Sequence, residues 1–285
     1  MVANVPTSGL ALIFARADSL TSREMPLDPF SRLGAAIPDL KERFATYAMF
    51  AKADVDALLG PNAAHAVRVG ATTFAHTVFL NRGAHFEAHA LPTAAQLAPA
   101  FGVVVADFDG DGKEDLFLAQ NFFPTEINTM RFDAGAGLLL LGDGHGGFNA
   151  QTVQQSGISV LGDQRGAAAA DYDGDARTDL AVSQNGAAMT LWHNVSARPG
   201  LRVRLRGSAN NPLAIGAQLR VVSNGIRGPV RELHGGSGYW SMDAATTVLA
   251  LPVGATALWV RWPDGREQTV SVAAGQHTIS LTTPP

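Results

Sequence analysis

One acidic pattern of nine residues occurs twice, and it constrains the fold more than any other feature of the sequence. The first copy, DFDGDGKED, spans residues 107–115, and the second, DYDGDARTD, spans residues 171–179. Both copies place carboxylates at positions 1, 3, 5 and 9. Two carboxylates about 4 Å apart repel by roughly 4 kcal/mol near a protein surface, so four in one turn require a cation or full solvation. The alternatives are therefore a metal loop and an acidic surface turn, and the repetition favours metal.

Calcium is the metal that we expect, because it prefers a shell of oxygen ligands and magnesium fits such a loop less well. Neither copy has the glutamate at position 12 that closes an EF-hand, since Leu118 and Val182 stand there. The expected ligands are the carboxylates of positions 1, 3, 5 and 9 and the main-chain carbonyl of position 7. They are Asp107, Asp109, Asp111, Lys113 and Asp115 in the first loop, and Asp171, Asp173, Asp175, Arg177 and Asp179 in the second.

Both loops have the same surroundings in the sequence. A run of small or apolar residues precedes each loop, at 103–106 and 167–170, and a second apolar run follows it. Two segments, 80–86 and 141–148, have the form of a strand, a glycine turn and a strand that begins with phenylalanine. A repeat of about 60 residues with four short strands is typical of a β-propeller blade, although most blades are shorter.

The N-terminal part differs from this pattern. Residues 9–17 predict a strand that has no earlier partner, and residues 28–60 predict a short helical insertion. Asp28 and Asp54 are the expected helix N-caps, and Gly60 is an expected stop. From about Ala66 to the end, the sequence predicts strands and no helices.

The C-terminal part begins near Ala197, where the repeat stops. Residues 196–285 contain nine arginines and only four acidic residues, although the whole chain has a net charge of -4. Arg202, Arg204 and Arg206 alternate with apolar residues and should share one strand face. That face could dock on the acidic part of the chain, stay in solvent, or bind a polyanion; we expect docking or solvation, and no nucleic acid. Further strands are expected near 218–222, 247–251, 257–262 and 278–281.

Catalytic motifs are weak. Gly142, Gly144 and Gly147 have dinucleotide-binding spacing, but a strand rather than a helix follows them. His234, Ser237 and Asp243 could be imagined as a hydrolase triad, yet the residue two positions after the serine is not the glycine of a nucleophile elbow. We expect a tight turn there, with Tyr239 and Trp240 packed. A deep pocket with convergent polar groups around Ser237 would favour an enzyme instead.

Other features narrow the function classes. The chain has no cysteine, which excludes disulfides and thiolate chemistry. No stretch is long enough to span a bilayer, and we see no signal peptide within this sequence. The segment Asn194 to Ser196 is an N-glycosylation sequon only if a eukaryote secretes the protein. The eight histidines form no recognisable metal motif.

The acidic loops and their flanking strands resemble the calcium loops of FG-GAP and VCBS repeats, the blades of integrin-α-like propellers. The tail resembles the ASPIC/UnbV domain that follows such repeats in bacterial proteins similar to cartilage acidic protein. The residues that carry this second resemblance are Asn210, Ala214, Ile215, Gly216, Ala217, Arg231, Glu232, Gly235, Gly236, Ser237, Gly238, Tyr239, Trp262, Pro263, Asp264, Gly265 and Arg266.

The resemblance implies a mainly β protein. Residues 1–196 would form a partial propeller of about three to four blades with the helical insertion at about 28–60, and residues 197–285 a small β domain. Because such propellers normally have about seven blades, the sequence resembles an N-terminally incomplete copy. Ala176 departs from the pattern, since glycine is expected at that turn, and the second site should be weaker.

The function that follows is a non-catalytic, calcium-binding module. It would serve protein or glycan binding or adhesion in an extracellular, periplasmic or cell-surface location, with an unknown ligand and oligomeric state. The alternative is a calcium-dependent hydrolase or the accessory domain of an enzyme that acts on envelope polymers. We expect no enzyme, because no paired carboxylate and nucleophile lie outside the metal loops.

Overall fold

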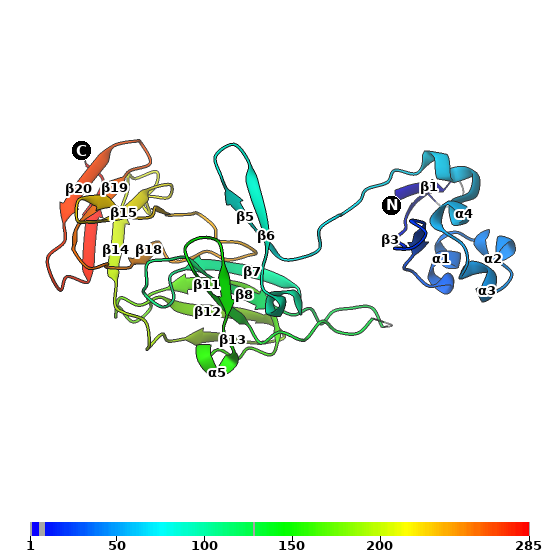
Figure 1. Cartoon of the computed structure of the whole chain (residues 1–285), viewed down its shortest axis with the longest axis horizontal. Helices are drawn as coiled ribbons and strands as arrows, with labels where there is room; N and C mark the ends of the chain where they lie inside the picture. Colours follow the sequence, from blue (N-terminus) through cyan, green and yellow to red (C-terminus); the bar gives the residue numbers. More distant parts are fainter. Residues whose placement is uncertain (1, 6–8, 128, 285) are drawn as a thin grey trace. The chain divides into compact units, whose positions relative to one another are not determined.

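The computed structural model describes residues 2–5, 9–127 and 129–284, and it is mainly β, as expected. The chain divides into two compact units, Met1–Phe74 and Ala75–Pro285 (Figure 1). The helices predicted at 28–60 lie in the first unit, and both acidic loops lie in the second. The domain boundary expected near Ala197 stays a prediction. No helix in the described part of the chain has the length and apolar character that crossing a membrane would require.

The first unit contains two antiparallel strand pairs. Strand β1 (Val2–Val5) pairs with β2 (Gly9–Leu12), and β3 (Ala15–Ala17) pairs with β4 (Glu24–Pro26). The prediction of one unpartnered strand over 9–17 is therefore wrong. Its first half has β1 as a partner, and the strand breaks at Ile13, which is fully buried in the core of this unit.

The predicted helical segment is confirmed as a series of short helices. They are α1 (Phe30–Ala36), α2 (Leu40–Arg43), α3 (Tyr47–Phe50), α4 (Val55–Leu59) and the 3₁₀ helix η1 (Gly60–His65). The Asp54 side chain caps α4 by accepting a hydrogen bond from the Ala57 N–H at 2.9 Å, as expected. Asp28 does not cap α1, because Pro29 occupies the N-cap position and Asp28 instead forms an ion pair with Arg32.

The second unit begins with short antiparallel sheets. Strands β5 (Thr77–Asn81) and β6 (Phe86–Ala90) form one hairpin, and β9 (Leu138–Gly142) and β10 (Phe148–Ala150) form another, so both predicted hairpins are confirmed. The second hairpin continues into β8 (Asp115–Gln120) and β7 (Ala100–Ala106), which gives the sheet order β10-β9-β8-β7. A separate sheet has the order β11 (Asp163–Ala170), β12 (Asp179–Asn185) and β13 (Ala187–Trp192).

The prediction of strands alone after Ala66 is wrong at two short helices. One is the 3₁₀ helix η2 (Thr93–Gln96), and the other is α5 (Val153–Ser156). Helix α5 starts at a capping box, in which the Thr152 side chain accepts from the Gln155 N–H and the Gln155 side chain accepts from the Thr152 N–H. This reciprocal pair was readable from the sequence as a threonine followed three residues later by glutamine.

The C-terminal part forms two sheets around one core. The first has the order β18 (Thr246–Leu249), β14 (Leu201–Arg206) and β21 (Thr278–Thr282). The second contains β16 (Ile226–Arg227), β15 (Gln218–Ser223), β19 (Ala255–Arg261) and β20 (Glu267–Ser271), and β17 (Arg231–Glu232) also pairs with β15. The four strands predicted from the sequence are all present, within a few residues at their ends.

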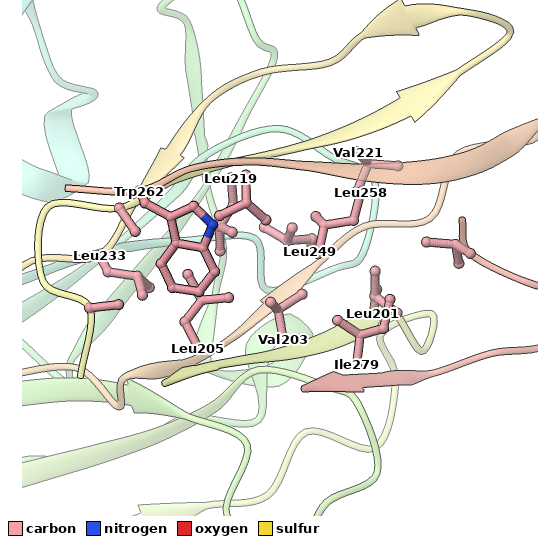
Figure 2. Packing of buried hydrophobic residues seen from close by; sticks show 14 residues of the cluster. Leu201, Val203, Leu205, Leu219, Val221, Leu233, Leu249, Leu258, Trp262 and Ile279 are labelled. Carbon is pink, nitrogen blue, oxygen red and sulfur yellow. The ribbon is translucent and has the colours of Figure 1, made fainter. Parts of the chain in front are cut away.

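Alternation along β14 explains how these sheets share a core. Leu201, Val203 and Leu205 are buried (Figure 2), whereas the arginines between and after them are not. These side chains pack with Trp262, which is 1% exposed, and with the leucines of β15 and β19. Complete burial of one such aliphatic side chain contributes about 1.5–3 kcal/mol. The arginine stripe is therefore turned away from the core, as its alternation predicted.

Candidate metal centres and a neighbouring cavity

The two acidic loops occupy equivalent places in their sheets. The first joins the antiparallel strands β7 and β8, and the second joins β11 and β12. In each sheet the strand after the loop pairs in turn with the next strand, β8 with β9 and β12 with β13. The apolar runs that flank both loops in the sequence are these strands, so the local repetition extends to the structure.

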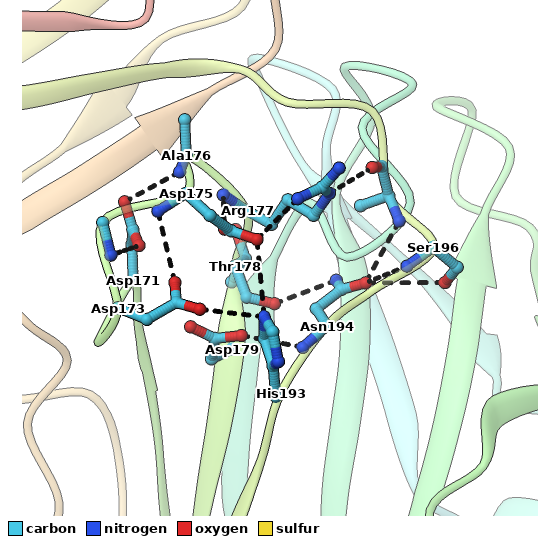
Figure 3. Close-up of polar contacts among 12 residues, drawn as sticks. Asp171, Asp173, Asp175, Ala176, Arg177, Thr178, Asp179, His193, Asn194 and Ser196 are labelled. Carbon is cyan, nitrogen blue, oxygen red and sulfur yellow. Dashed lines mark hydrogen bonds and ion pairs between the residues drawn. The ribbon is translucent and has the colours of Figure 1, made fainter.

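The position 1 carboxylates hold the turns by the same bonds. Asp107 accepts hydrogen bonds from the N–H groups of Gly110 at 2.7 Å and Gly112 at 2.9 Å. The matching bonds to Asp171 come from Gly174 at 2.8 Å and Ala176 at 3.2 Å (Figure 3). One carboxylate thus orders the backbone of each turn before any cation is considered.

The position 9 carboxylates repeat in the same way. Asp115 accepts from the Phe108 N–H and from the Gly142 N–H, each at 2.8 Å. Asp179 accepts from the Tyr172 N–H at 3.1 Å and from the Asn194 N–H at 2.8 Å. Each carboxylate therefore ties the start of its loop to the neighbouring strand, and Asn194 is the structural counterpart of Gly142.

Three of the four predicted carboxylates converge in each loop. Ligand atoms of positions 1, 3 and 9 lie within 4.8 Å of one another, and the two triads are Asp107, Asp109 and Asp115, and Asp171, Asp173 and Asp179. Burial raises the pKa of Asp115 to about 6, and it also raises the pKa of Asp107 and of Asp179; charges of nearby acidic residues add to each increase. Grouped, desolvated carboxylates of this kind favour the binding of a cation.

The position 5 carboxylates make other contacts in both loops. Asp111 forms an ion pair with Lys113 at 2.7 Å, and Asp175 forms one with Arg177 at 2.5 Å. Although burial opposes the change, these hydrogen bonds lower the pKa of Asp111 and of Asp175. The structure thus does not group position 5 with the other three ligands, and the carbonyl ligands expected at Lys113 and Arg177 stay predictions.

The residue at position 6 shows how the two turns differ. Gly112 has a φ of 90°, and Ala176 at the equivalent place has a φ of 64°, which is the left-handed conformation that was expected there. A side chain in this region costs roughly 1 kcal/mol relative to glycine. Glycine is also required at position 4 of the first loop, because a Cβ atom at Gly110 would lie 2.6 Å from the carbonyl oxygen of Arg198.

His193 is a functional candidate that the sequence reasoning missed. Its Nε2 lies 2.9 Å from Asp173 Oδ2 and 3.4 Å from Asp175 Oδ2 (Figure 3), and the three residues form a further group with metal-ligand spacing. An alignment of the two copies that continued past the loops to the next strand would have placed His193 beside the second loop. His193 precedes Asn194 as Leu141 precedes Gly142, so the second copy alone carries an imidazole beside its carboxylates.

The Asn194 side chain bridges the two loops. Its Nδ2 donates to the Phe108 carbonyl at 2.8 Å and to the Thr178 carbonyl at 3.0 Å, and its Oδ1 accepts from the N–H groups of Ser196 and Ala197. Phe108 belongs to the first loop and Thr178 to the second. Because the amide nitrogen is already used in two hydrogen bonds, the sequon at Asn194 is a poor glycosylation site in the folded protein.

Two arginines of the C-terminal sheets dock on the acidic loops. Arg202 lies 3.0 Å from Asp171 Oδ2, and Arg231 lies 2.7 Å from Glu114 Oε2. The docking of the arginine stripe is therefore seen at Arg202, whereas Arg204 and Arg206 are exposed. Burial raises the pKa of Glu114 and the charge of Arg231 lowers it, so this pair compensates only part of the desolvation.

A cavity of about 630 Å³ lies between the outer faces of β7 and β11 and the segments 230–238 and 243–248. Its lining residues include Ser237, His234 and Asp243. A pocket at this position is the feature that would favour an enzyme. Among the described residues, however, no hydrogen bond joins Ser237 to His234, and the Ser237 hydroxyl lies near Asp243 without a hydrogen bond of good geometry. His234 is exposed and lies 3.7 Å from Glu232 instead.

The turn beside this cavity differs from its prediction in one respect. Tyr239 makes an edge contact with Phe101 at a centroid distance of 5.5 Å, but Trp240 is 90% exposed. Trp240 has a positive φ of 49°, and its ring stacks on that of Tyr239 at a centroid distance of 5.9 Å. The expectation that both aromatic residues pack is therefore confirmed for Tyr239, whereas Trp240 stacks on the Tyr239 ring and is not buried.

Whether calcium suits the loops depends on their donors. Each triad offers only carboxylate oxygens, and these are the hard ligands that calcium prefers. The first triad contains two buried carboxylates, Asp107 and Asp115, that have no cationic partner in the described part of the chain. The first loop therefore fits calcium. In the second loop, Arg202 and His193 already contact the acidic groups and would compete with a metal ion.

Comparison with known proteins identifies one part of the chain. No curated protein matches it. Residues 207–285 match the family described as ASPIC and UnbV, and this stretch contains most of the two C-terminal sheets and all three groups of residues on which the resemblance was based. The C-terminal β region is accordingly similar to ASPIC and UnbV domains over residues 207–285.

Proposed function

We propose that the chain is a non-catalytic calcium-binding module, in which propeller-type sheets of the FG-GAP and VCBS kind carry an ASPIC and UnbV domain. The observation that carries the proposal is the repetition of the loop geometry, because the same carboxylates accept hydrogen bonds from the same loop positions in both copies. Calcium would connect positions 1, 3 and 9 and so hold the strands in place. Its role is structural.

The working surface is proposed to lie on the sheet faces or on the C-terminal domain, and to bind a protein or a glycan in an extracellular, periplasmic or cell-surface location. Calcium-clamped loops suit that location, because free calcium is plentiful outside cells and the weaker extracellular sites have dissociation constants of about 0.1–1 mM. Adhesion is one use of such a module.

Thermal melting in calcium and then in chelator tests the metal sites. Calcium at 100 times its dissociation constant should stabilise the protein by about 2.7 kcal/mol per site. Asp109→Ala should remove most of the gain, and Asp173→Ala should remove less, because Ala176, Arg202 and His193 weaken the second site. Asp133→Asn, which changes an exposed acid outside both loops, is the control. An equal melting temperature with calcium and with chelator in the unmodified protein would refute the proposal.

A second candidate is a calcium-dependent hydrolase or the accessory domain of an enzyme that acts on envelope polymers. The cavity at Ser237 is the observation in its favour. Hydrolysis of activated esters and of envelope glycans, measured for the full chain and for Ser237→Ala, decides between the two. Calcium-dependent turnover that is lost in Ser237→Ala would establish the enzyme, whereas equal background rates would support the binding module.

A further inference from the structure

The cavity between the acidic sheets and the C-terminal domain has the size of a small-molecule site. Its volume of about 630 Å³ falls within the range of about 300–1,000 Å³ that is typical of ligand pockets. Its walls come from segments far apart in the sequence, and all of them belong to the second compact unit. Apolar and polar side chains both line it, which is also usual for such sites.

The charges around the cavity are mostly negative. Four carboxylates line it, those of Glu114, Asp171, Glu232 and Asp243, whereas Arg231 is its one arginine. Arg231 neutralises Glu114, and Arg202 pairs with Asp171 from outside the lining. The remaining potential favours a cation over an anion.

Asp243 is the carboxylate that a ligand could use. Its Oδ1 accepts a hydrogen bond from the Ala169 N–H at 2.7 Å, and in the described part of the chain no lysine, arginine or histidine forms an ion pair with it. Burial raises the pKa of Asp243, whereas its hydrogen bond from Ala169, the nearby Ser237 hydroxyl and the charges of Arg231 and His234 at longer range lower it. A half-buried carboxylate that has no direct ion pair is only partly compensated by more distant charges, so a cation that reaches it stabilises it further.

Ser237 supplies a second polar group at the same place. Its Oγ is buried and lies near the Asp243 carboxylate, but it makes no hydrogen bond of good geometry in the described part of the chain. Buried hydroxyls are normally satisfied by protein, water or ligand. A donor that reached the Asp243 carboxylate would therefore also meet an acceptor at Ser237, and an ammonium group has three donors for such a pair.

The rest of the wall is aliphatic. Val103 and Val105 project from the outer face of β7, with exposed fractions of 37% and 49%, and Val230 faces the cavity from the C-terminal domain with 42%. Alanines 169, 170, 244 and 245 complete this surface without large polar groups. An alkyl chain would bury apolar area there at about 25 cal/mol per Å².

We infer that this cavity binds a small aliphatic ammonium ion, which donates hydrogen bonds to Asp243 and Ser237 and packs its alkyl part on Val103, Val105 and Val230. This site is separate from the metal triads and goes beyond the proposed calcium-binding role. A neutral alcohol would leave the Asp243 charge uncompensated, and a carboxylate ligand would be repelled by it.

Three probes with one alkyl chain and different head groups test this inference: hexylammonium, 1-hexanol and hexanoate. Isothermal titration calorimetry with the full chain in calcium should show saturable binding of hexylammonium below about 10 mM, with 1-hexanol at least about 10-fold weaker and hexanoate weaker still. Equal or tighter binding of the alcohol or of hexanoate overturns the inference, and so does the absence of hexylammonium binding.

Two variants locate the site. Asp243→Asn keeps an acceptor for the Ala169 N–H but removes the charge, and it should weaken hexylammonium binding by about 10- to 100-fold; Ser237→Ala should weaken it by about 3- to 10-fold. Asp133→Asn is the matched control and should bind as the unmodified protein does. Retained affinity in a correctly melting Asp243→Asn protein refutes the site. Since the calcium-dependent melting gain is measured separately, failure here leaves the proposed function intact.

Discussion

Replacing Asn194 with alanine should destabilise the second unit by breaking the bridge between the two acidic loops. The change removes two hydrogen bonds from Nδ2 to the Phe108 and Thr178 carbonyls and the bond that Oδ1 accepts from the Ala197 N–H. Each is partly buried, and each contributes about 1 kcal/mol net, so Asn194→Ala should cost about 2–3 kcal/mol. For a unit of this size, the melting temperature should fall by about 4–12 °C.

Asn194→Asp separates the donor from the acceptor functions of this side chain. It keeps the oxygen that accepts from Ser196 and Ala197 but places a carboxylate oxygen against two carbonyls. At neutral pH it should be at least as unstable as Asn194→Ala. Asn210→Ala, at an exposed turn of the C-terminal domain, is the control.

Urea unfolding followed by tryptophan fluorescence and by circular dichroism measures these differences. Both probes should give the same order of stability, and calcium should stabilise the two Asn194 variants less than the control, because the bridge joins the two metal loops. If Asn194→Ala and Asn210→Ala unfold within about 0.5 kcal/mol of each other, the bridge is not a stabilising element and the reasoning is refuted.

Two further changes test the electrostatics. In the metal-free protein the pKa of Asp115 is raised to about 6, so its ionisation lowers the free energy of unfolding as the pH rises through that value. Because calcium competes with the proton, the calcium-dependent melting gain should be complete near pH 7 and smaller near about pH 5, where calcium affinity falls roughly 10-fold. An equal melting gain at both pH values would contradict this prediction. Arg231→Gln leaves the half-buried Glu114 carboxylate without its partner, so this change should destabilise the protein by about 1–2 kcal/mol in denaturant unfolding. Adding Glu114→Gln should recover part of that loss. Strict additivity of the two changes in unfolding free energy would argue against the ion pair.

Local patterns predicted much of the second unit. The strand, acidic loop and strand units, both glycine hairpins and the inward face of β14 follow from alternation and turn chemistry that neighbouring residues determine. The Asp54 cap of α4 is equally local. These features could be read from the sequence because each depends on residues within about ten positions of one another.

Contacts between distant segments could not be read in the same way. His193 reaches Asp173 only because β13 pairs with β12, and Asn194 reaches Phe108 across 86 residues of sequence. The cavity requires β7, β11 and the C-terminal domain to be in place together. Which strands become neighbours depends on long-range pairing, and one sequence of unknown register does not determine that pairing.

The hydrogen bonds at Ala169 have a consequence for how the protein behaves in concentrated solution. Strand β11 is the outer strand of its sheet, and its Ala169 N–H and carbonyl are bound by the Asp243 side chain and the Ala244 N–H. An outer strand with free main-chain groups is a template for β-pairing with other molecules and so for aggregation. By occupying these groups, the segment around Asp243 covers this part of the sheet edge. If the segment detached from β11, the exposed edge strand would favour self-association.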